Sequence, residues 1–148
     1  MTFQDSASRR QPRGSRTGAA TVEFALVAPL FLLLLAGIIE FGQAFRIEHS
    51  LTNAVRHGAR AAIVQGALTS QVVNKVRSDC NKHLGVPPGD VNVTVAVNGN
   101  TGVDLSDAEA TDEISVTASI SYAKVGVGFF SNTFAKSNLS STCTLERE

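Results

Sequence analysis

The chain has 148 residues, with 13 basic and 13 acidic side chains, so its formal net charge is zero. This length allows one domain plus an anchor. The charges are uneven: arginines at positions 9, 10, 13 and 16 precede a long apolar run, and only Asp5 offsets them. They lack interleaved aromatic residues and a later basic element, which excludes a nucleic-acid surface. They indicate instead a flank on the cytoplasmic side of a membrane, with the rest of the chain exported.

The apolar run is long enough to cross a membrane. From Ala19 to Ile39 the only charged residue is Glu23, and a helix of this length spans about 31 Å, close to the hydrocarbon thickness. We therefore predict a transmembrane helix over residues 19–41. A secretory signal peptide would be shorter and end at a small-residue cleavage site, whereas this run continues directly into Glu40. Pro29 lies inside the run and is predicted to kink the helix.

Glu23 needs a reason to be there, because a charge in hydrocarbon costs roughly 2.5–3.5 kcal/mol even on mild scales. One reading is that it caps the first turn at the level of the lipid headgroups, near the positive end of the helix dipole.

Beyond the membrane, apolar residues continue at helical spacing, which predicts an amphipathic stalk over residues 42–65 as part of one helix from about Ala20 to Val64, with Gly66 as its stop. A second helix is predicted from a cap at Thr69 or Ser70 to Gly85.

Alternating stretches then predict three strands, at 91–97, 114–122 and 139–145, with a turn at Asn98–Gly99 and a loop over 126–134. Residues 66–148 are thus predicted to form an exported α+β domain, in which a small antiparallel sheet packs on the helices.

The two cysteines, Cys80 and Cys143, both follow the apolar run. In an oxidising compartment they are a candidate disulfide, and the alternative is two buried thiols. The three histidines lack a ligand set, and the acidic stretch 104–113 lacks the spacing of a calcium loop, although an ion there stays an alternative. No nucleophile elbow or phosphate loop occurs. We therefore expect no catalytic residue, metal site or cofactor.

The start of the apolar run resembles the processing site of a known family. The specific motif is a Gly, four residues, a Glu and an aromatic residue, Gly18-Ala19-Ala20-Thr21-Val22-Glu23-Phe24. Further matching features are Pro29, the exit Gly37-Ile38-Ile39-Glu40-Phe41-Gly42, the Ala/Gly-Ala-Arg segment 53–60 and the alternating stretch 140–148. Together they resemble the TadE-like minor pilins or pseudopilins of the tight-adherence (Tad/Flp) branch of type IV pili.

The resemblance implies that residues 1–18 are a leader, cut between Gly18 and Ala19 by a prepilin peptidase. Glu23 would then pair with the new amine of Ala19 in a neighbouring subunit during pilus assembly. The implied partners are other Tad pilins and the inner-membrane assembly platform. The implied location is the cytoplasmic membrane, with one span, a cytoplasmic N-terminus and an exported domain, or an extracellular pilus. The alternative is an uncleaved, membrane-anchored binding module of the cell envelope.

Overall fold

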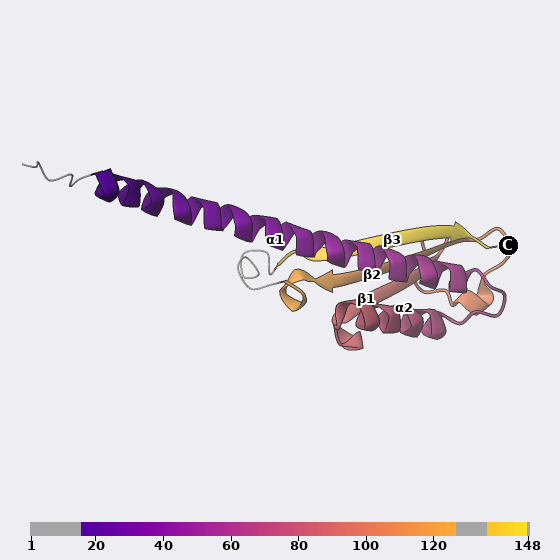
Figure 1. Ribbon diagram of the computed structural model, residues 1–148. Coiled ribbons are helices and arrows are strands. Elements are labelled where there is room, and N and C mark those ends of the chain that lie inside the picture. Colours follow the sequence, from indigo (N-terminus) through magenta and orange to yellow (C-terminus); the bar gives the residue numbers. More distant parts are fainter. Residues whose placement is uncertain (1–15, 127–135, 148) are drawn as a thin grey trace, which may run out of the picture. The chain divides into compact units, whose positions relative to one another are not determined.

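The computed structural model describes residues 16–126 and 136–147 (Figure 1). Most of the predicted leader and of the predicted 126–134 loop therefore lies outside the described residues. In chain order the regular elements are two helices, α1 (Arg16–Ala62) and α2 (Thr69–Leu84), then three strands, β1 (Val91–Val97), β2 (Glu113–Ser121) and β3 (Asn138–Glu146). Short 3₁₀ turns cover Pro88–Asp90, Leu105–Asp107 and Tyr122–Lys124. The predicted α+β class, with a long N-terminal helix, a second helix and a three-stranded antiparallel sheet, is confirmed.

The chain divides into two compact units, Met1–Gly37 and Ile38–Glu148. The described part of the first unit is helical throughout and continues through Pro29 without a break. Its described side chains are mostly exposed, and large apolar ones such as Phe24, Leu30 and Phe31 are more than half exposed. The predicted kink at Pro29 stays a prediction.

The second unit is built on an antiparallel sheet with the order β1-β2-β3. The register places Val95 opposite Val116 and Val116 opposite Cys143, so the side chains of these three residues share one face. On β2 that face is buried at every second residue, as the alternating sequence predicts. The opposite face carries mainly Ser and Thr, and it includes the pair Thr117–Thr142, whose hydroxyls lie 2.9 Å apart.

Both helices cover the apolar face of the sheet. The core cluster joins Ile47, Leu51 and Val55 of α1 to the buried residues of α2 and of the strands. Helix α1 approaches α2 closely at Gly58, where an added Cβ would lie 2.3 Å from Cγ2 of Val76. The amphipathic half of α1 is thus a structural part of the second unit.

The ends of the helices and strands agree with the predictions to within a few residues, but the predicted N-terminal cap of α2 differs. Helix α2 ends at Gly85 with φ of 67°, the left-handed conformation expected of a C-terminal glycine. Its N-cap is Leu68, which makes no side-chain cap, so the predicted cap at Thr69 or Ser70 is wrong. The Thr69 hydroxyl instead accepts a hydrogen bond from the Leu105 amide at 3.0 Å. This hydrogen bond connects the long loop between β1 and β2 to the start of α2.

The predicted turn at Asn98–Gly99 is confirmed. Both residues have positive φ, 50° and 79°, and Val97 and Asn100 exchange backbone hydrogen bonds of 3.0 and 2.8 Å across them. Helix α1 ends at Ala62, two residues before the predicted end. Gly66, the predicted stop, follows in a turn with φ of 77°.

Candidate functional site

The predicted processing junction lies in the first turns of α1. Gly18 and Ala19 are both exposed, and no atom lies within 4 Å of where a Cβ on Gly18 would be. The junction is helical, so a protease that needs an extended substrate must first unwind this terminus. The first turn of a helix is the part that frays most easily, because its N–H groups lack partners within the helix.

Glu23 follows Ala19 by four residues on the same helix, and this spacing places both on one face, one turn apart. Its side chain is exposed, and it makes no ion pair with any of the described residues. The carboxylate is therefore directed away from its own chain, in the part of α1 that is apolar on every side. The arrangement leaves the carboxylate available to a positive group from another molecule.

The apolar part of α1 meets the requirements of a membrane span. The helix contains a window of 18 residues with a mean hydropathy of 2.5, none of it buried inside the protein. In the described residues this is the one helix long and apolar enough to cross a membrane. Such a helix fits single-pass anchoring.

A second carboxylate, Glu40, ends the apolar run in a very different environment. Its side chain is only 6% exposed, and Oε1 accepts a hydrogen bond of 2.5 Å from the hydroxyl of Tyr122. Tyr122 itself is 4% exposed. Burial, together with the hydrogen bond and charge of Glu40, raises the pKa of Tyr122 to about 12. The pair connects α1 to the end of β2 by a bond to a charged acceptor, the stronger kind of hydrogen bond.

The ring of Tyr122 is held by the turn that follows it. The amide of Gly126 donates to the carbonyl of Tyr122 at 2.8 Å. A Cβ on Gly126 would lie 2.8 Å from a ring carbon of Tyr122, so only glycine fits here without movement of the ring. Sequence reasoning placed Glu40 in the exit motif and Tyr122 on a strand without pairing them. The sequence signal that could have found this pair was the carboxylate at the end of the apolar run. A carboxylate that becomes buried needs a hydrogen-bond donor.

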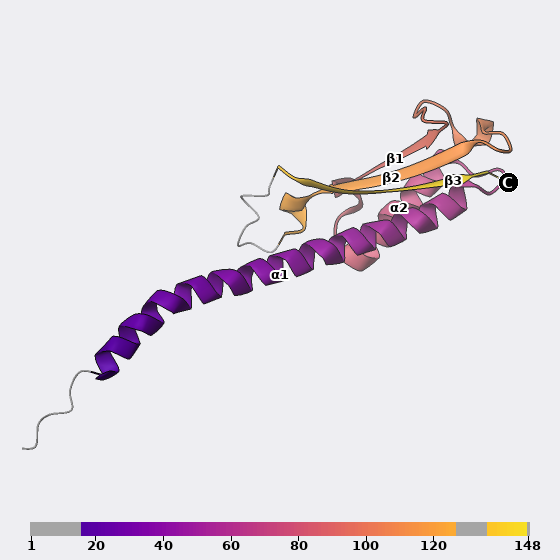
Figure 2. The ribbon, with the colours of Figure 1, turned by 90° about the horizontal axis from the view of Figure 1, so that it is seen from above.

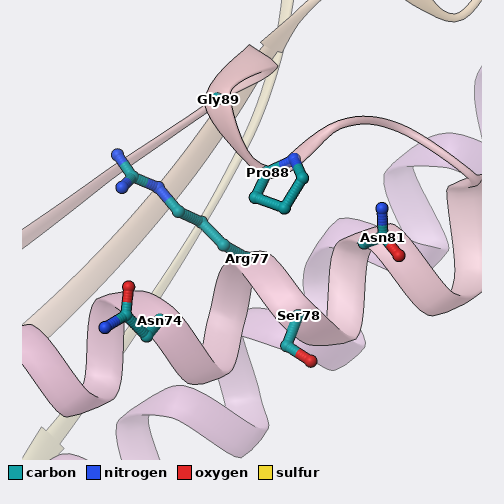
Figure 3. Close-up of a pocket in the computed structure, with 6 residues that line it drawn as sticks. All are labelled: Asn74, Arg77, Ser78, Asn81, Pro88 and Gly89. Atoms are coloured by element: carbon teal, nitrogen blue, oxygen red, sulfur yellow. The ribbon is translucent and has the colours of Figure 1, made fainter.

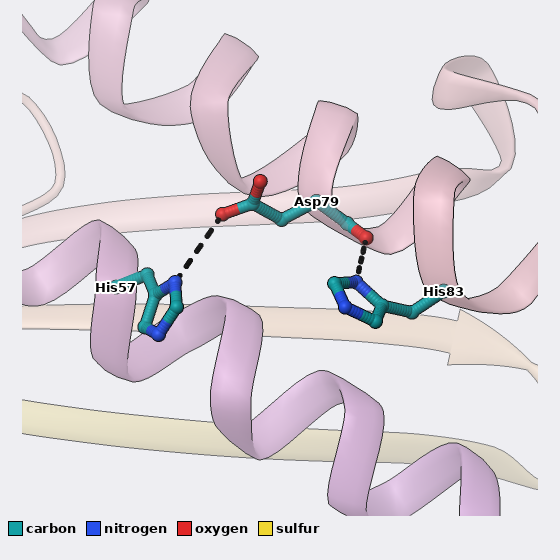
Figure 4. A network of polar contacts seen from close by, with 3 residues as sticks. All are labelled: His57, Asp79 and His83. Carbon is teal, nitrogen blue, oxygen red and sulfur yellow. Dashed lines mark hydrogen bonds and ion pairs between the residues drawn. The ribbon is translucent and has the colours of Figure 1, made fainter.

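The helices α1 and α2 are also connected by a polar contact (Figure 4). Nδ1 of His57 lies 3.8 Å from Oδ2 of Asp79, an oxygen that is buried and has no hydrogen bond. Nδ1 of His83 lies 2.7 Å from the backbone oxygen of Asp79, one turn earlier on α2. All three histidines, His49 included, are exposed, and no cluster of three or more metal-ligating residues occurs in the described parts of the chain.

The two cysteines are free thiols in the structure. Cys80 is fully buried on α2, and burial raises its pKa to about 11, with a further contribution from the charge of Asp79. Cys143 is half-buried on β3. Both thiols belong to the same apolar core, and their predicted disulfide stays a prediction.

The acidic stretch 104–113 is organised by hydrogen bonds within the protein. Asp104 accepts from the amide of Ser106, which lowers the pKa of Asp104. Asp112 accepts from the amide of Glu109, which lowers its pKa, and Asn98 adds a second bond. The buried guanidinium of Arg147 donates to the carbonyl of Leu105 at 2.7 Å. These bonds give the carboxylates a structural role in closing the loop.

A shallow hollow of about 350 Å³ lies between α2 and the turn before β1 (Figure 3). It is lined by Asn74, Arg77, Ser78 and Asn81 on α2 and by Pro88 and Gly89 opposite. Nε of Arg77 donates to the carbonyl of Val91 at 3.3 Å, so this side chain fastens the start of β1.

The fold and the site together define a class of protein: a small α+β domain whose first helix extends from an apolar, membrane-length segment carrying one exposed carboxylate. The comparison with protein families is more specific. Residues 18–60 match the family described as TadE-like protein, so the predicted resemblance is confirmed for this part of the chain. The match supports a role associated with the Tad pilus, and pilins of this kind are structural proteins. No curated protein and no solved structure matches the chain.

Proposed function

We propose that this chain is a minor pilin or pseudopilin of a Tad/Flp-type pilus, inserted in the cytoplasmic membrane and processed by a prepilin peptidase. The observation that carries the proposal is the TadE-like match over residues 18–60, which coincides with the exposed apolar part of α1 and its continuation. In this proposal residues 1–18 are the leader, 19–41 span the membrane, and 42–65 form the stalk that enters the folded part of residues 66–148.

The peptidase would cut the peptide bond between Gly18 and Ala19 by adding water across it. Cutting releases the leader, with its four arginines, and leaves an ammonium on Ala19. The arginines hold the leader on the cytoplasmic side until then. The lack of a Cβ on Gly18 lets the unwound terminus enter a narrow cleft.

Glu23 would act in the next step, in which subunits pack their apolar helices side by side. Its carboxylate would pair with the Ala19 ammonium of a neighbouring subunit, so that two charges neutralise one another in low dielectric. Such pairs contribute little net stability but fix the register of packed helices. The exposed position of Glu23, without a partner among the described residues, supports this role.

The proposal is tested by the intact mass and N-terminal sequence of the protein from membranes with and without the peptidase. A chain that begins at Ala19 only when the peptidase is present supports it. A chain that keeps its arginines under both conditions supports the alternative, an uncleaved envelope anchor with a binding domain. A Gly18→Leu variant is the matched control, because normal cleavage of that variant would place the junction elsewhere.

A further inference from the structure

Strand β3 forms one edge of the sheet, and the register shows which of its backbone groups make no bond to β2. In an antiparallel pair, residues that exchange hydrogen bonds alternate with residues that do not. Just beyond the two ends of β3, Tyr122 N donates to Ser137 O and Arg147 N donates to Asp112 O, both at 2.9 Å. Continuing this alternation along the register, the odd-numbered residues of β3 bond to β2. The even-numbered residues present their N–H and C=O groups at the edge, and all of them are exposed: Asn138, Ser140, Thr142, Thr144 and Glu146.

Within residues 16–126 and 136–147, this edge lacks the usual protection against strand pairing. Natural edge strands carry Lys or Pro, are short, or are interrupted by a bulge. Strand β3 has nine residues, none of them Lys, Arg or Pro, and pairs with β2 in an uninterrupted register. The other edge, on β1, is closed at both ends: Arg77 donates to the carbonyl of Val91, and Val97 exchanges two bonds with Asn100.

The apolar face is also incompletely covered at β3. Ile120, Val116 and Ile114 of β2 are at most 2% exposed, but the residues opposite them on β3 are only partly buried. These are Leu139, Cys143 and Leu145. A further strand at this edge would cover them.

The sequence of β3 is close to symmetric about Thr142. If two copies pair antiparallel around this residue, Leu139 lies opposite Leu145, and Ser140 lies opposite Thr144. All nine residues then have a partner, each outward N–H and C=O meets an outward group, and no like charges face each other. We propose that β3 is a docking edge for a second copy of this chain, forming a continuous sheet across a two-fold axis.

The antiparallel pairing fixes the direction of one copy relative to the other. From Ile38 onwards α1 runs in the same direction as β3 (Figures 1 and 2), so the α1 segments of two paired copies run in opposite directions. The contact goes beyond the proposed assembly function and does not depend on it.

The test uses the full chain in detergent micelles, with Cys143→Ser so that the buried Cys80 is the one remaining native thiol. A Thr142→Cys variant places two new thiols opposite one another, with Cα atoms about 5.5 Å apart, within reach of a disulfide. A Thr144→Cys variant is the matched control. Its two thiols would be four residues apart along the strands, roughly 13 Å, too far to bridge. Mixing Ser140→Cys with Thr144→Cys should restore the cross-link.

Under mild oxidation, the Thr142→Cys chain should give at least tenfold more covalent dimer than the Thr144→Cys chain. Thr142→Pro removes an outward N–H and no backbone bond to β2, although it also removes the hydroxyl contact with Thr117. It should weaken dimerisation measured by sedimentation at least tenfold. Equal cross-linking of the two cysteine variants would overturn the proposal, as would a Thr142→Cys chain that stays monomeric while its circular dichroism shows it folded. Neither result affects processing at Gly18–Ala19, so the two proposals fail independently.

Discussion

Replacing Tyr122 by phenylalanine removes one hydroxyl and leaves the buried carboxylate of Glu40 without its donor. The donor–acceptor distance is 2.5 Å, and both side chains are at most 6% exposed, so water does not easily replace the lost bond. A hydrogen bond to a charged group contributes about 1.5–3 kcal/mol. We expect the variant to lose that much free energy of unfolding. For a domain of this size the melting temperature should fall by about 6–12 °C.

The measurement is thermal and urea unfolding of the full chain in mild detergent, followed by circular dichroism. Thr117→Val is the matched control, because it removes one hydroxyl of the Thr117–Thr142 contact on the exposed face of the sheet and should cost less than about 0.5 kcal/mol. In a Glu40→Gln background, Tyr122→Phe should cost only about 1 kcal/mol, since a neutral amide loses less. Equal costs in both backgrounds would refute the charged hydrogen bond.

The same pair predicts a dependence on pH. The pKa of Tyr122 is raised from 10.0 to about 12, so folding favours the protonated hydroxyl. The stabilisation is complete below pH 10 and is lost as the pH rises through 12. The difference in unfolding free energy between the native chain and Tyr122→Phe should therefore shrink across this window, and a constant difference would contradict the assignment.

Three further predictions concern other parts of the chain. Gly58→Ala places a methyl group 2.3 Å from Val76 and should cost about 1–3 kcal/mol of unfolding free energy; an unchanged melting temperature would show that the helices can separate. If Cys80 and Cys143 form a disulfide in the exported protein, the protein should migrate faster in a non-reducing gel than in a reducing one. Identical mobility, with Cys143 alkylated in the native state and Cys80 only after unfolding, would remove the disulfide. Glu23→Ala should leave insertion and cleavage intact but reduce pilus assembly, and assembly at the native level would support the headgroup-cap reading.

The local elements of this protein follow from its sequence. The run from Ala19 to Ile39 has to be helical in a membrane, because only a helix satisfies its own backbone groups there. Strict alternation in 91–97 and 114–122 predicted strands with one buried face, since side chains of a strand point alternately to opposite sides. Positive φ at Asn98 and Gly99, and at Gly85, was predictable because these residues tolerate the left-handed region.

Long-range partners were decided only by the tertiary structure. Glu40 and Tyr122 are 82 residues apart, and no periodicity in either segment indicates that they meet. Thr69 had the chemistry of a helix cap but bonds to Leu105, because a hydroxyl at a helix start can serve any nearby amide. The strand pattern of residues 139–145 was readable, yet the order β1-β2-β3, which leaves β3 at an open edge, depends on how the strands pack on α1 and α2. Sequence periodicity fixes which face of an element is apolar, whereas the packing of those faces decides which element lies beside which.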